Sequence, residues 1–197
     1  TTYDQDRNLT RDLDQVMTKQ ALADQRFENI LELGCGTGKN TAFLSTIAKH
    51  VHALDFSEGM INRARRKTGT DSVEFSIADL IRPWPANNEC HDLIVCNLVL
   101  EHVEDLSHIF NEAFRSLRKG GRFYISELHP FRQYQGGKAR FQRGELVTEV
   151  PAYVHHVSDF LHAAVTNNLT MESFNKFWHA EDDGKPPRLA VFEFKKA

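Results

Sequence analysis

The feature that most constrains the fold is the stretch ELGCGTGKN at residues 32–40, in which three glycines alternate with other residues. A largely apolar run stops at the first glycine, Gly34, and a helical pattern begins at Thr41. Glycine has no Cβ and tolerates positive φ, so such a turn lets a ligand lie against bare backbone. The unpaired N–H groups that open the following helix attract acidic or polar ligand groups. The stretch therefore predicts a strand, a ligand-binding turn and a helix.

Strands and helices are predicted to alternate over the first two thirds of the chain, which is typical of a doubly wound α/β sheet. The clearest amphipathic pattern lies just before Gly120 and Gly121, which we expect to end that helix. Ser57 is the expected N-cap of an earlier helix. The predicted helices cover residues 9–22, 41–48, 58–66 and 106–117, and the predicted strands cover residues 29–33, 51–54, 73–77, 91–97 and 122–127.

The last third of the chain breaks this alternation. Residues 129–157 are too long for an ordinary connection, so we expect them to form a functional excursion on the substrate side. Ser158 is the expected cap of a helix that runs to Thr166. Residues 169–178 and 188–194 then have the pattern of two strands without a crossover helix between them. We expect these two strands to pair antiparallel.

The bulk composition is that of an ordinary globular protein. The chain has 197 residues, so we expect a single domain over residues 1–197, with an N-terminal helical segment at residues 1–28. The formal charge of −3 offers no basic surface for nucleic acid, and no apolar run approaches the roughly 20 residues that span a membrane. The three cysteines form no CxxC pair, which favours free thiols in a cytoplasmic protein. Because the chain does not begin with Met, we expect its natural start to lie upstream.

Polar side chains follow four of the predicted strands, at the edge where open α/β sheets bind their ligands. Glu32 precedes the glycine turn. Asp55 lies roughly 20 residues beyond Gly34, where a carboxylate can accept hydrogen bonds from a ribose hydroxyl pair. Asp79 follows the third strand and can accept a hydrogen bond from an adenine amine. Asn97 ends the fourth strand, near the rest of such a ligand.

Two other glycine motifs can be tested on the same residues. A phosphate-binding GxxxxGK[ST] loop would need glycine where Leu33 stands and Ser or Thr where Asn40 stands. A dinucleotide fingerprint, GxGxxG, would need glycine in place of Lys39. In addition, Glu32 would repel a pyrophosphate but could bind a cationic amine, directly or through water. The implied ligand carries adenosine and a positive charge rather than phosphates.

On these motifs the chain resembles the class I S-adenosylmethionine-dependent methyltransferases of the small, single-domain, type 11-like kind. The family's first motif, an acid followed by GxGxG, is matched from Glu32 to Gly38. Asp55 in LDFSEGM matches its ribose-binding acid, and Asp79 in IADL matches its acid beside adenine. The stretches DLIVCNLVLEHVEDL and LRKGGRFYISELHP match two further blocks of the family. Several ordered motifs together are specific in a way that one glycine turn is not.

The resemblance implies a Rossmann-like, doubly wound sheet of seven strands, mostly parallel with an antiparallel last strand. It also implies an enzyme that uses S-adenosylmethionine to methylate a small-molecule acceptor, with no nucleic acid, membrane or metal as partner. Because the sulfonium is already an activated methyl donor, catalysis would rest on positioning and on exclusion of water. The residues implied in cofactor binding are Glu32, Gly34, Cys35, Gly36, Thr37, Gly38, Asp55, Phe56, Ser57, Met60, Ala78, Asp79, Leu80, Asn97, Leu98 and His102.

Three histidines are the candidate catalytic residues, since an imidazole titrates near neutral pH and can act as a general base. His129 directly follows the fifth predicted strand, where an acceptor should approach the methyl group. His155 and His156 lie where relatives often place residues on the substrate side. The alternative for each is a structural or exposed histidine. The adjacent pair is not expected to bind metal, because neighbouring residues rarely offer two ligands on one face.

Other functions stay open on the sequence alone. A nicotinamide-dependent oxidoreductase shares the topology but needs the glycine that Lys39 replaces. A nucleic-acid or protein methyltransferase would share the cofactor site, although the sequence after Asn97 lacks the Asn/Asp-Pro-Pro-aromatic motif used against flipped bases. A protein that binds S-adenosylmethionine or S-adenosylhomocysteine without catalysis is a further alternative. The sequence names neither the acceptor nor the oligomeric state.

Overall fold

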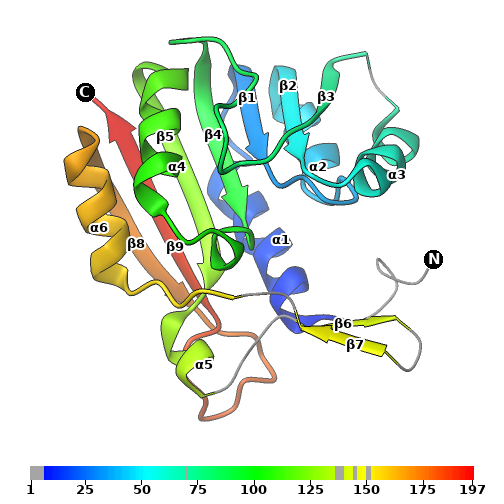
Figure 1. The fold of residues 1–197 in the computed structure, drawn as a ribbon, viewed down its shortest axis with the longest axis vertical. Coiled ribbons are helices and arrows are strands. Elements are labelled where there is room, and N and C mark those ends of the chain that lie inside the picture. Colours follow the sequence, from blue (N-terminus) through cyan, green and yellow to red (C-terminus); the bar gives the residue numbers. More distant parts are fainter. Residues whose placement is uncertain (1–6, 70, 136–139, 144–145, 150–151) are drawn as a thin grey trace.

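Seven strands form one sheet in the order β3-β2-β1-β4-β5-β9-β8 in the computed structural model, which describes residues 7–69, 71–135, 140–143, 146–149 and 152–197 (Figure 1). The strands are β1 (Phe27–Leu33), β2 (Ala48–Asp55), β3 (Val73–Ile77), β4 (His91–Asn97), β5 (Leu117–Leu128), β8 (Leu169–Phe177) and β9 (Leu189–Lys196). The first five strands of this order run parallel, whereas β9 runs antiparallel to both of its neighbours. The predicted Rossmann-like sheet with an antiparallel last strand is therefore confirmed.

The strand order reverses between β1 and β4. From β1 the chain moves outward to β2 and β3, and it then returns to place β4 on the other side of β1. Leu31 pairs with Ile94 and Leu33 pairs with Cys96, so both strands end at the same edge. Open α/β sheets bind their ligands at such a switch point. The glycine turn, which follows β1 directly, lies there.

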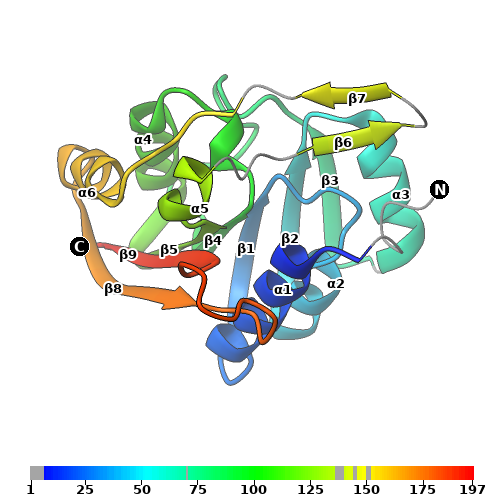
Figure 2. The same cartoon turned by 90° about the horizontal axis from the view of Figure 1, so that it is seen from below.

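Helices cover both faces of the sheet (Figures 1 and 2). One face carries α1 (Leu9–Leu22), α2 (Thr41–Ile47) and α3 (Glu58–Thr68), and the other carries α4 (Leu106–Ser116) and α6 (Val157–Thr166). Alternate side chains of a strand point to opposite faces. Ile30 accordingly belongs to the same buried cluster as Leu13 of α1, whereas Leu31 belongs to the same cluster as Phe110 of α4. The core is thus divided into one layer on each face of the sheet.

Local sequence explains where several helices begin. The side chain of Asn8 accepts hydrogen bonds from the backbone N–H groups of Thr10 and Arg11, each at 3.1 Å, and so fixes the start of α1. Ser57 caps α3 as predicted, and Asp105 caps α4. The bounds predicted for α1, β3 and β4 agree with the structure.

The glycine pair after α4 does not end that helix, contrary to the prediction. The helix ends at Ser116, and β5 begins at Leu117, so Gly120 and Gly121 lie inside the strand. A Cβ on Gly121 would lie 2.9 Å from the carbonyl oxygen of His91, which shows how closely the two backbones approach. The pairing of β4 with β5 shifts register at this place. The glycines therefore serve an irregular strand start rather than a helix end.

The segment at residues 129–157 contains regular structure that the sequence did not predict. Its elements are the short helix α5 (Pro130–Tyr134) and the antiparallel strands β6 (Arg140–Arg143) and β7 (Leu146–Glu149). These elements lie beyond the edge of the sheet where the parallel strands end (Figure 1). The cap of α6 is His156 and not Ser158, because the backbone N–H of His156 also donates to Asp159 in a capping box. The predicted pairing of the last two strands, β8 and β9, is confirmed.

A buried ion pair holds the connection between β8 and β9 in place. Asp182 forms an ion pair with Arg132 of α5, at 2.7 Å, and accepts a hydrogen bond from the Nε of Arg188, at 3.0 Å. Arg188 also donates to the hydroxyl of Thr10 at 3.0 Å, which links the connection to the start of α1. Burial alone would raise the pKa of Asp182, but hydrogen bonds from Arg188, the His179 backbone and Arg132 lower it to about 2. Asp182 therefore stays charged at neutral pH and fastens α5 and α1 to this connection.

We expect Asp182→Asn to lower the free energy of unfolding by about 2 kcal/mol at pH 7, because two arginines lose their charged partner. Urea unfolding followed by circular dichroism measures the change. The charge of Asp182 stabilises the fold fully above the pKa of an unfolded aspartate, about 3.9, and this stabilisation is lost as the pH falls towards 2. The difference in unfolding free energy between the wild type and Asp182→Asn should therefore become smaller at acidic pH. Asp183→Asn, at the exposed neighbouring position, is the control, and an equal loss in both variants would contradict the role of the ion pair.

Candidate functional site

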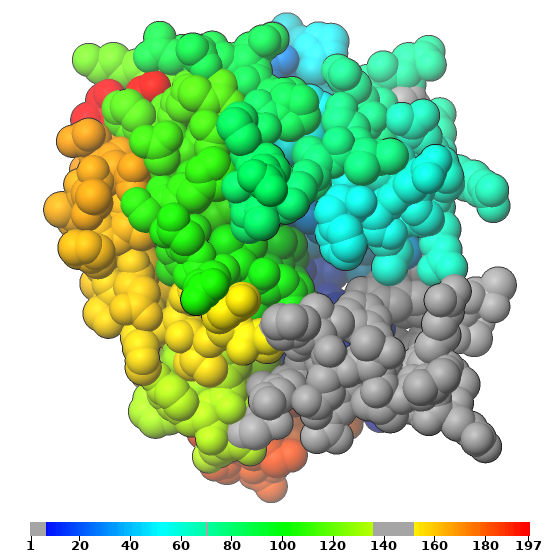
Figure 3. Space-filling model, viewed as in Figure 1, coloured from blue at the N-terminus to red at the C-terminus, as the bar shows by residue number. Residues whose placement is uncertain are grey.

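A pocket of about 120 Å³ lies at the carboxyl ends of β1 and β4. Figure 3 shows a hollow in the surface between the cyan segment near residue 60 and the green segment near residue 100. The pocket is smaller than the roughly 300–1,000 Å³ of sites that enclose a whole drug-sized ligand, so it suits one end of a longer molecule. Its lining residues are Arg11, Asp14, Glu32, Leu33, Gly34, Cys35, Gly36, Thr37, Lys39, Asn40, Asn97 and Leu98.

The three glycines of the turn have different tasks. All three have positive φ, at +68° for Gly34, +54° for Gly36 and +79° for Gly38. A Cβ on Gly34 would lie 2.2 Å from the side chain of Val99, so this glycine allows the turn to touch the segment after β4. A Cβ on Gly38 would lie 3.1 Å from Ala64 of α3. A Cβ on Gly36 would meet nothing within 4 Å, so this glycine leaves the backbone open towards the pocket.

Asp55 ties the glycine turn to the start of α3. One carboxylate oxygen accepts the backbone N–H of Gly36, and the other accepts the backbone N–H of Ser57, both at 2.8 Å. Each oxygen has a second lone pair, so the carboxylate can accept further hydrogen bonds from a ligand. Asp55 is therefore placed to hold the turn and to bind hydroxyl groups at once.

Glu32 is a buried carboxyl group inside the pocket. Its Oε2 accepts a hydrogen bond from the hydroxyl of Thr41 at 2.5 Å. Burial raises the pKa of Glu32 to about 7, and the negative charges of Asp55 and Asp14 add to this rise, while the bond from Thr41 opposes it. Burial and the negative charges of Glu32 and Asp55 also raise the pKa of the Cys35 thiol, so Cys35 is a small filler of the turn and not a nucleophile.

A polar network joins α1 to the pocket. The carboxylate of Asp14 accepts hydrogen bonds from the amide of Asn40 at 3.1 Å and from the amide of Asn97 at 2.7 Å. Asn97 also donates to Thr18 at 2.9 Å. Asn97, predicted from the sequence as a ligand contact, therefore lines the pocket and at the same time anchors α1.

The turn after β4 is held in a strained form by β5. Leu98 has a φ of +56°, which is uncommon for a side chain of this kind. Its N–H donates to the carbonyl of Ser126 at 2.8 Å. The next two N–H groups, of Val99 and Leu100, both donate to the carboxyl of Glu127 at 2.8 Å. Burial raises the pKa of Glu127 to about 8. The sequence did not single out Glu127, whose role depends on this tertiary contact.

A second group of predicted cofactor residues lies at the same sheet edge but outside the pocket. Asp55 and Ile77 pair at the ends of β2 and β3, and the N–H of the next residue, Ala78, donates to the Asp55 carbonyl at 2.9 Å. Phe56 is 79% exposed, although an aromatic ring of this size is usually covered. Asp79 is exposed, and its carboxylate accepts the backbone N–H of Ile81, two residues further on in the same turn, at 3.2 Å. The predicted residues placed in this group are Phe56, Ser57, Met60, Ala78, Asp79, Leu80 and His102.

His129 has a local structural contact. It precedes α5, and its Nδ1 accepts the backbone N–H of Phe131 at 3.3 Å, as an N-cap does. Burial and the nearby positive charge of Lys176 lower the pKa of His129, so the ring is neutral near pH 7. With Nδ1 as acceptor, the proton of the neutral ring lies on Nε2. A catalytic role for His129 stays a prediction.

The other two candidate histidines also make anchoring contacts. The Nε2 of His155 lies 3.1 Å from the carbonyl oxygen of Leu100 and 2.7 Å from that of Val103, so this nitrogen is the donor. His156 caps α6 and contacts the hydroxyl of Tyr134. These contacts do not exclude catalysis, which stays a prediction for both residues.

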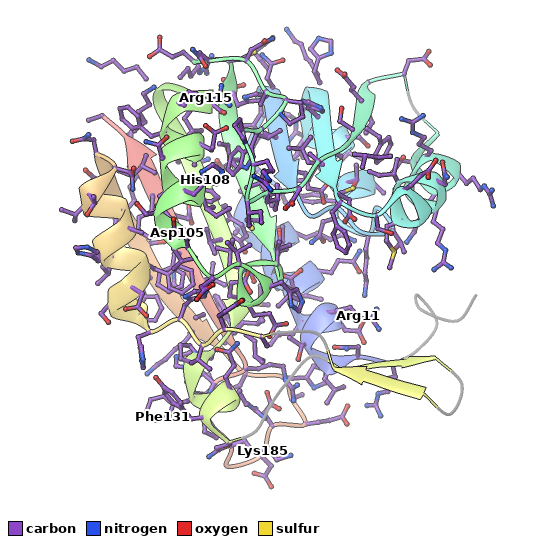
Figure 4. All side chains as sticks on the ribbon, viewed as in Figure 1. Arg11, Asp105, His108, Arg115, Phe131 and Lys185 are labelled. Atoms are coloured by element: carbon purple, nitrogen blue, oxygen red, sulfur yellow. The ribbon has the colours of Figure 1, made fainter. Side chains whose placement is uncertain are left out.

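Sequence reasoning missed five residues that line the pocket, namely Arg11, Asp14, Leu33, Lys39 and Asn40. Figure 4 places Arg11 on α1, at the edge where β4 ends. The only signal for Asp14 was an acid on a helix whose other buried residues are Leu13, Thr18 and Leu22. Lys39 and Asn40 served only to reject other motifs, although Lys39 forms an ion pair with Asp12 at 2.8 Å.

Among the described residues, no group of three or more His, Cys, Asp or Glu side chains could hold a metal ion. No helix of the described residues has the length and apolar character needed to cross a membrane.

Comparison with known proteins agrees with this geometry. The family described as Methyltransferase domain matches residues 31–125. A demethylmenaquinone methyltransferase of Clavibacter sepedonicus is 38% identical over 114 residues, which cover 57% of this chain and 46% of that protein. A malonyl-[acyl-carrier protein] O-methyltransferase of Bacillus cereus is 30% identical over 129 residues, which cover 64% of this chain and 47% of that protein. The chain thus spans about half the length of these curated relatives.

A solved structure extends the likeness of the fold to most of the chain. The S-adenosylmethionine-dependent methyltransferase of Mesorhizobium loti has a TM-score of 0.74, with 87% of this chain and 92% of that chain covered. At 21% sequence identity this likeness concerns the fold. The family match, for its part, runs from β1 to β5 and includes the glycine turn, Asp55, Asp79 and Asn97. Residues 31–125 thus carry a methyltransferase domain of the S-adenosylmethionine-dependent class, and the described residues have the fold of this class.

Proposed function

We propose that this protein is an enzyme that transfers a methyl group from S-adenosylmethionine to a small organic acceptor. The observation that carries the proposal is the pair of carboxyl groups at the glycine turn. Glu32 is buried in the pocket, and Asp55 borders the turn from β2. A carboxylate inside the pocket would repel a phosphate but attracts the cationic end of this cofactor, while Asp55 suits its ribose hydroxyls.

The proposed contacts divide the cofactor between the two groups of residues at the sheet edge. The pocket takes the amino-acid end and the sulfonium, because it holds Glu32 and the open backbone at Gly36. Asp55 takes the ribose, and the exposed ring of Phe56 together with Asp79 takes the adenine. The full set proposed is Glu32, Gly34, Cys35, Gly36, Thr37, Gly38, Asp55, Phe56, Ser57, Met60, Ala78, Asp79, Leu80, Asn97, Leu98 and His102.

The bound cofactor supplies a methyl group that its sulfonium already activates. The residues of the chain therefore need only hold the reactants in line and keep water out. Among the histidines, His155 uses its Nε2 as a donor to two carbonyl groups, which leaves Nδ1 as the nitrogen that could accept a proton. His155 also lines a cavity of about 10 Å³ with Glu101, Glu127 and Tyr153, which is room for no more than one water.

A small-molecule acceptor has two lines of support. The net charge of −3 disfavours a nucleic-acid substrate. The names of the two relatives give demethylmenaquinone and a malonyl group on a carrier protein as their acceptors, so each modifies a small organic group. We also place the protein in the cytoplasm, since Cys35, Cys90 and Cys96 are all free thiols.

We expect the protein to bind S-adenosylmethionine and S-adenosylhomocysteine in isothermal titration calorimetry. Asp55→Ala should weaken this binding at least tenfold, because the ribose loses its acceptor and the turn loses its bond to Gly36. Glu74→Ala is the matched control, since this carboxylate lies on the adjacent strand β3, is exposed and is remote from the carboxyl ends. Unchanged affinity in Asp55→Ala, with the fold intact, would rule out this assignment of Asp55.

We expect the affinity for S-adenosylhomocysteine to rise with pH between about 5.5 and 7, where its ammonium group stays charged. The pKa of Glu32 lies near 7 in the free protein, so the carboxyl is largely protonated at pH 5.5 and must release a proton to meet the cation. Calorimetry in buffers of different ionisation enthalpy should show close to one proton released at pH 5.5, and less at pH 8.

Glu32→Gln tests the source of this proton, because glutamine keeps the shape of the side chain but cannot ionise. The variant should bind more weakly at pH 7 and should lose most of the proton release. If proton release persists unchanged in Glu32→Gln, another group near the pocket, such as Asp14, is its source.

The acceptor class can be read from where a labelled methyl group goes. The protein is incubated with methyl-labelled S-adenosylmethionine and a cell extract, which is then separated into small-molecule, protein and nucleic-acid fractions. We expect the label in the small-molecule fraction. Label on a small carrier protein would indicate a carrier-bound acceptor, and label on nucleic acid would overturn the proposal. Intact cofactor binding without any transfer would favour a non-catalytic binding protein.

A further inference from the structure

Asp14 is a buried carboxyl group of α1 that touches two residues distant in sequence. Its side chain is 3% exposed and lines the same pocket as Glu32. It accepts hydrogen bonds from the amides of Asn40, at the start of α2, and Asn97, at the end of β4. Asp14 and Arg11 are the residues of α1 that line this pocket.

The contacts with Asp14 fix how both amides are turned. A carboxylate only accepts hydrogen bonds, so the NH₂ group of each amide faces Asp14 and its oxygen faces away. The Oδ1 atoms of Asn40 and Asn97 are buried and have no hydrogen-bond partner among the described residues. Asn40 stands at the N-cap of α2 but makes no capping bond, although that is the usual use of its oxygen.

The pocket thus holds two acceptors that no donor among the described residues reaches. The two amide oxygens belong to residues that line the pocket together with Asp14 and Glu32. Neither cation of the lining, Arg11 or Lys39, donates to them, and Lys39 is paired with Asp12 at 2.8 Å. Buried polar atoms are costly to leave unpaired, so their persistence at a ligand site indicates a ligand donor. An ammonium group has three donors and no acceptor, which fits this set.

We propose that Asp14 is a positioning residue for the α-amino group of the cofactor, because it turns the amides of Asn40 and Asn97 so that their oxygens accept hydrogen bonds from that group. The inference rests on the proposed assignment of this pocket to S-adenosylmethionine. It adds a residue of α1 and a specific geometry to that assignment.

A purely structural role for Asp14 has to be separated from this one. The same network continues through Thr18, which accepts from Asn97, to the hydroxyl of Tyr124 at 3.4 Å. Loss of Asp14 could therefore loosen the packing of α1 on the sheet. Such a loss would affect all ligands of the site together, whereas loss of the amide geometry would affect only ligands with an amino group.

The test compares two ligands that differ at the amino-acid end. S-adenosylhomocysteine carries the α-amino group, whereas 5′-methylthioadenosine has the same adenosine and thioether but no amino-acid end. We expect Asp14→Asn to weaken binding of S-adenosylhomocysteine at least tenfold in calorimetry and to leave binding of 5′-methylthioadenosine within twofold. The amides of Asn40 and Asn97 donate to different oxygens of Asp14, and asparagine replaces one of these oxygens with an NH₂ group, which cannot accept.

Two further variants make the result decisive. Tyr124→Phe removes the far end of the network and should lower the melting temperature without changing the ratio of the two affinities. Asn40→Ala keeps Asp14 and removes one oxygen, so it should show the same selective loss even if Asp14→Asn does not fold. The double variant Asp14→Asn/Asn40→Ala should lose less binding free energy for S-adenosylhomocysteine than the two single variants lose in sum, because Asp14 acts through Asn40.

The outcomes separate this inference from the proposed function. An equal loss for both ligands, or no loss for either, in Asp14→Asn and Asn40→Ala would overturn the positioning role while the cofactor assignment stands. A wild-type protein that binds 5′-methylthioadenosine as tightly as S-adenosylhomocysteine would overturn the positioning role too. A wild-type protein that binds neither ligand would overturn the cofactor assignment and, with it, this inference.

Discussion

The close approach of the glycine turn to the segment after β4 is the constraint on which the site depends. Any side chain at Gly34 would collide with Val99. Val99 in turn is fixed through its N–H by Glu127 of β5, and the turn is fixed through Gly36 by Asp55 of β2. The ends of four neighbouring strands are thus locked together by backbone donors and buried carboxyl groups. A rigid edge of this kind can hold reacting groups in line, which is the main requirement of methyl transfer from an activated donor.

The electrostatics of this edge follow from the same arrangement. Glu32 and Glu127 are buried, with pKa values raised to about 7 and about 8, and burial raises the pKa of Asp14 as well. Carboxyl groups gathered in a low-dielectric site disfavour their own ionisation. A cationic ligand reverses this effect, because it stabilises the charged form of each neighbouring carboxylate. This arrangement of carboxyl groups therefore favours a cationic ligand over an anionic one, in agreement with the sequence, which predicts a ligand without phosphates.

The sequence predicted the parts of the fold that depend on local pattern. The bounds of α1 and the cap of α3 at Ser57 follow from helical periodicity and from side chains that bond to nearby backbone. The prediction failed at Gly120 and Gly121, where the need for glycine comes from the carbonyl of His91 on another strand. It also missed the hairpin of β6 and β7 and assigned the cap of α6 to Ser158 instead of His156. At the glycine pair a neighbour in space decided the local structure, whereas the cap of α6 rests on the nearby Asp159, which accepts the backbone N–H of His156.

By itself, the sequence determined the fold class and the cofactor family. The alternation of strand and helix patterns predicts the sheet, and the order of Glu32, the glycines, Asp55 and Asp79 predicts the edge of the sheet that binds the ligand. Only the tertiary structure brought Asp14 into the pocket, since its contact with Asn97 joins residues more than eighty positions apart. It also placed His155 against the carbonyl groups of Leu100 and Val103, which lie more than fifty positions away in the sequence. The physical reason is that the hydrogen-bond partners of a buried side chain depend on which strands and helices pack together. A sequence motif shows which residues end a strand, but it does not show which other element packs against them.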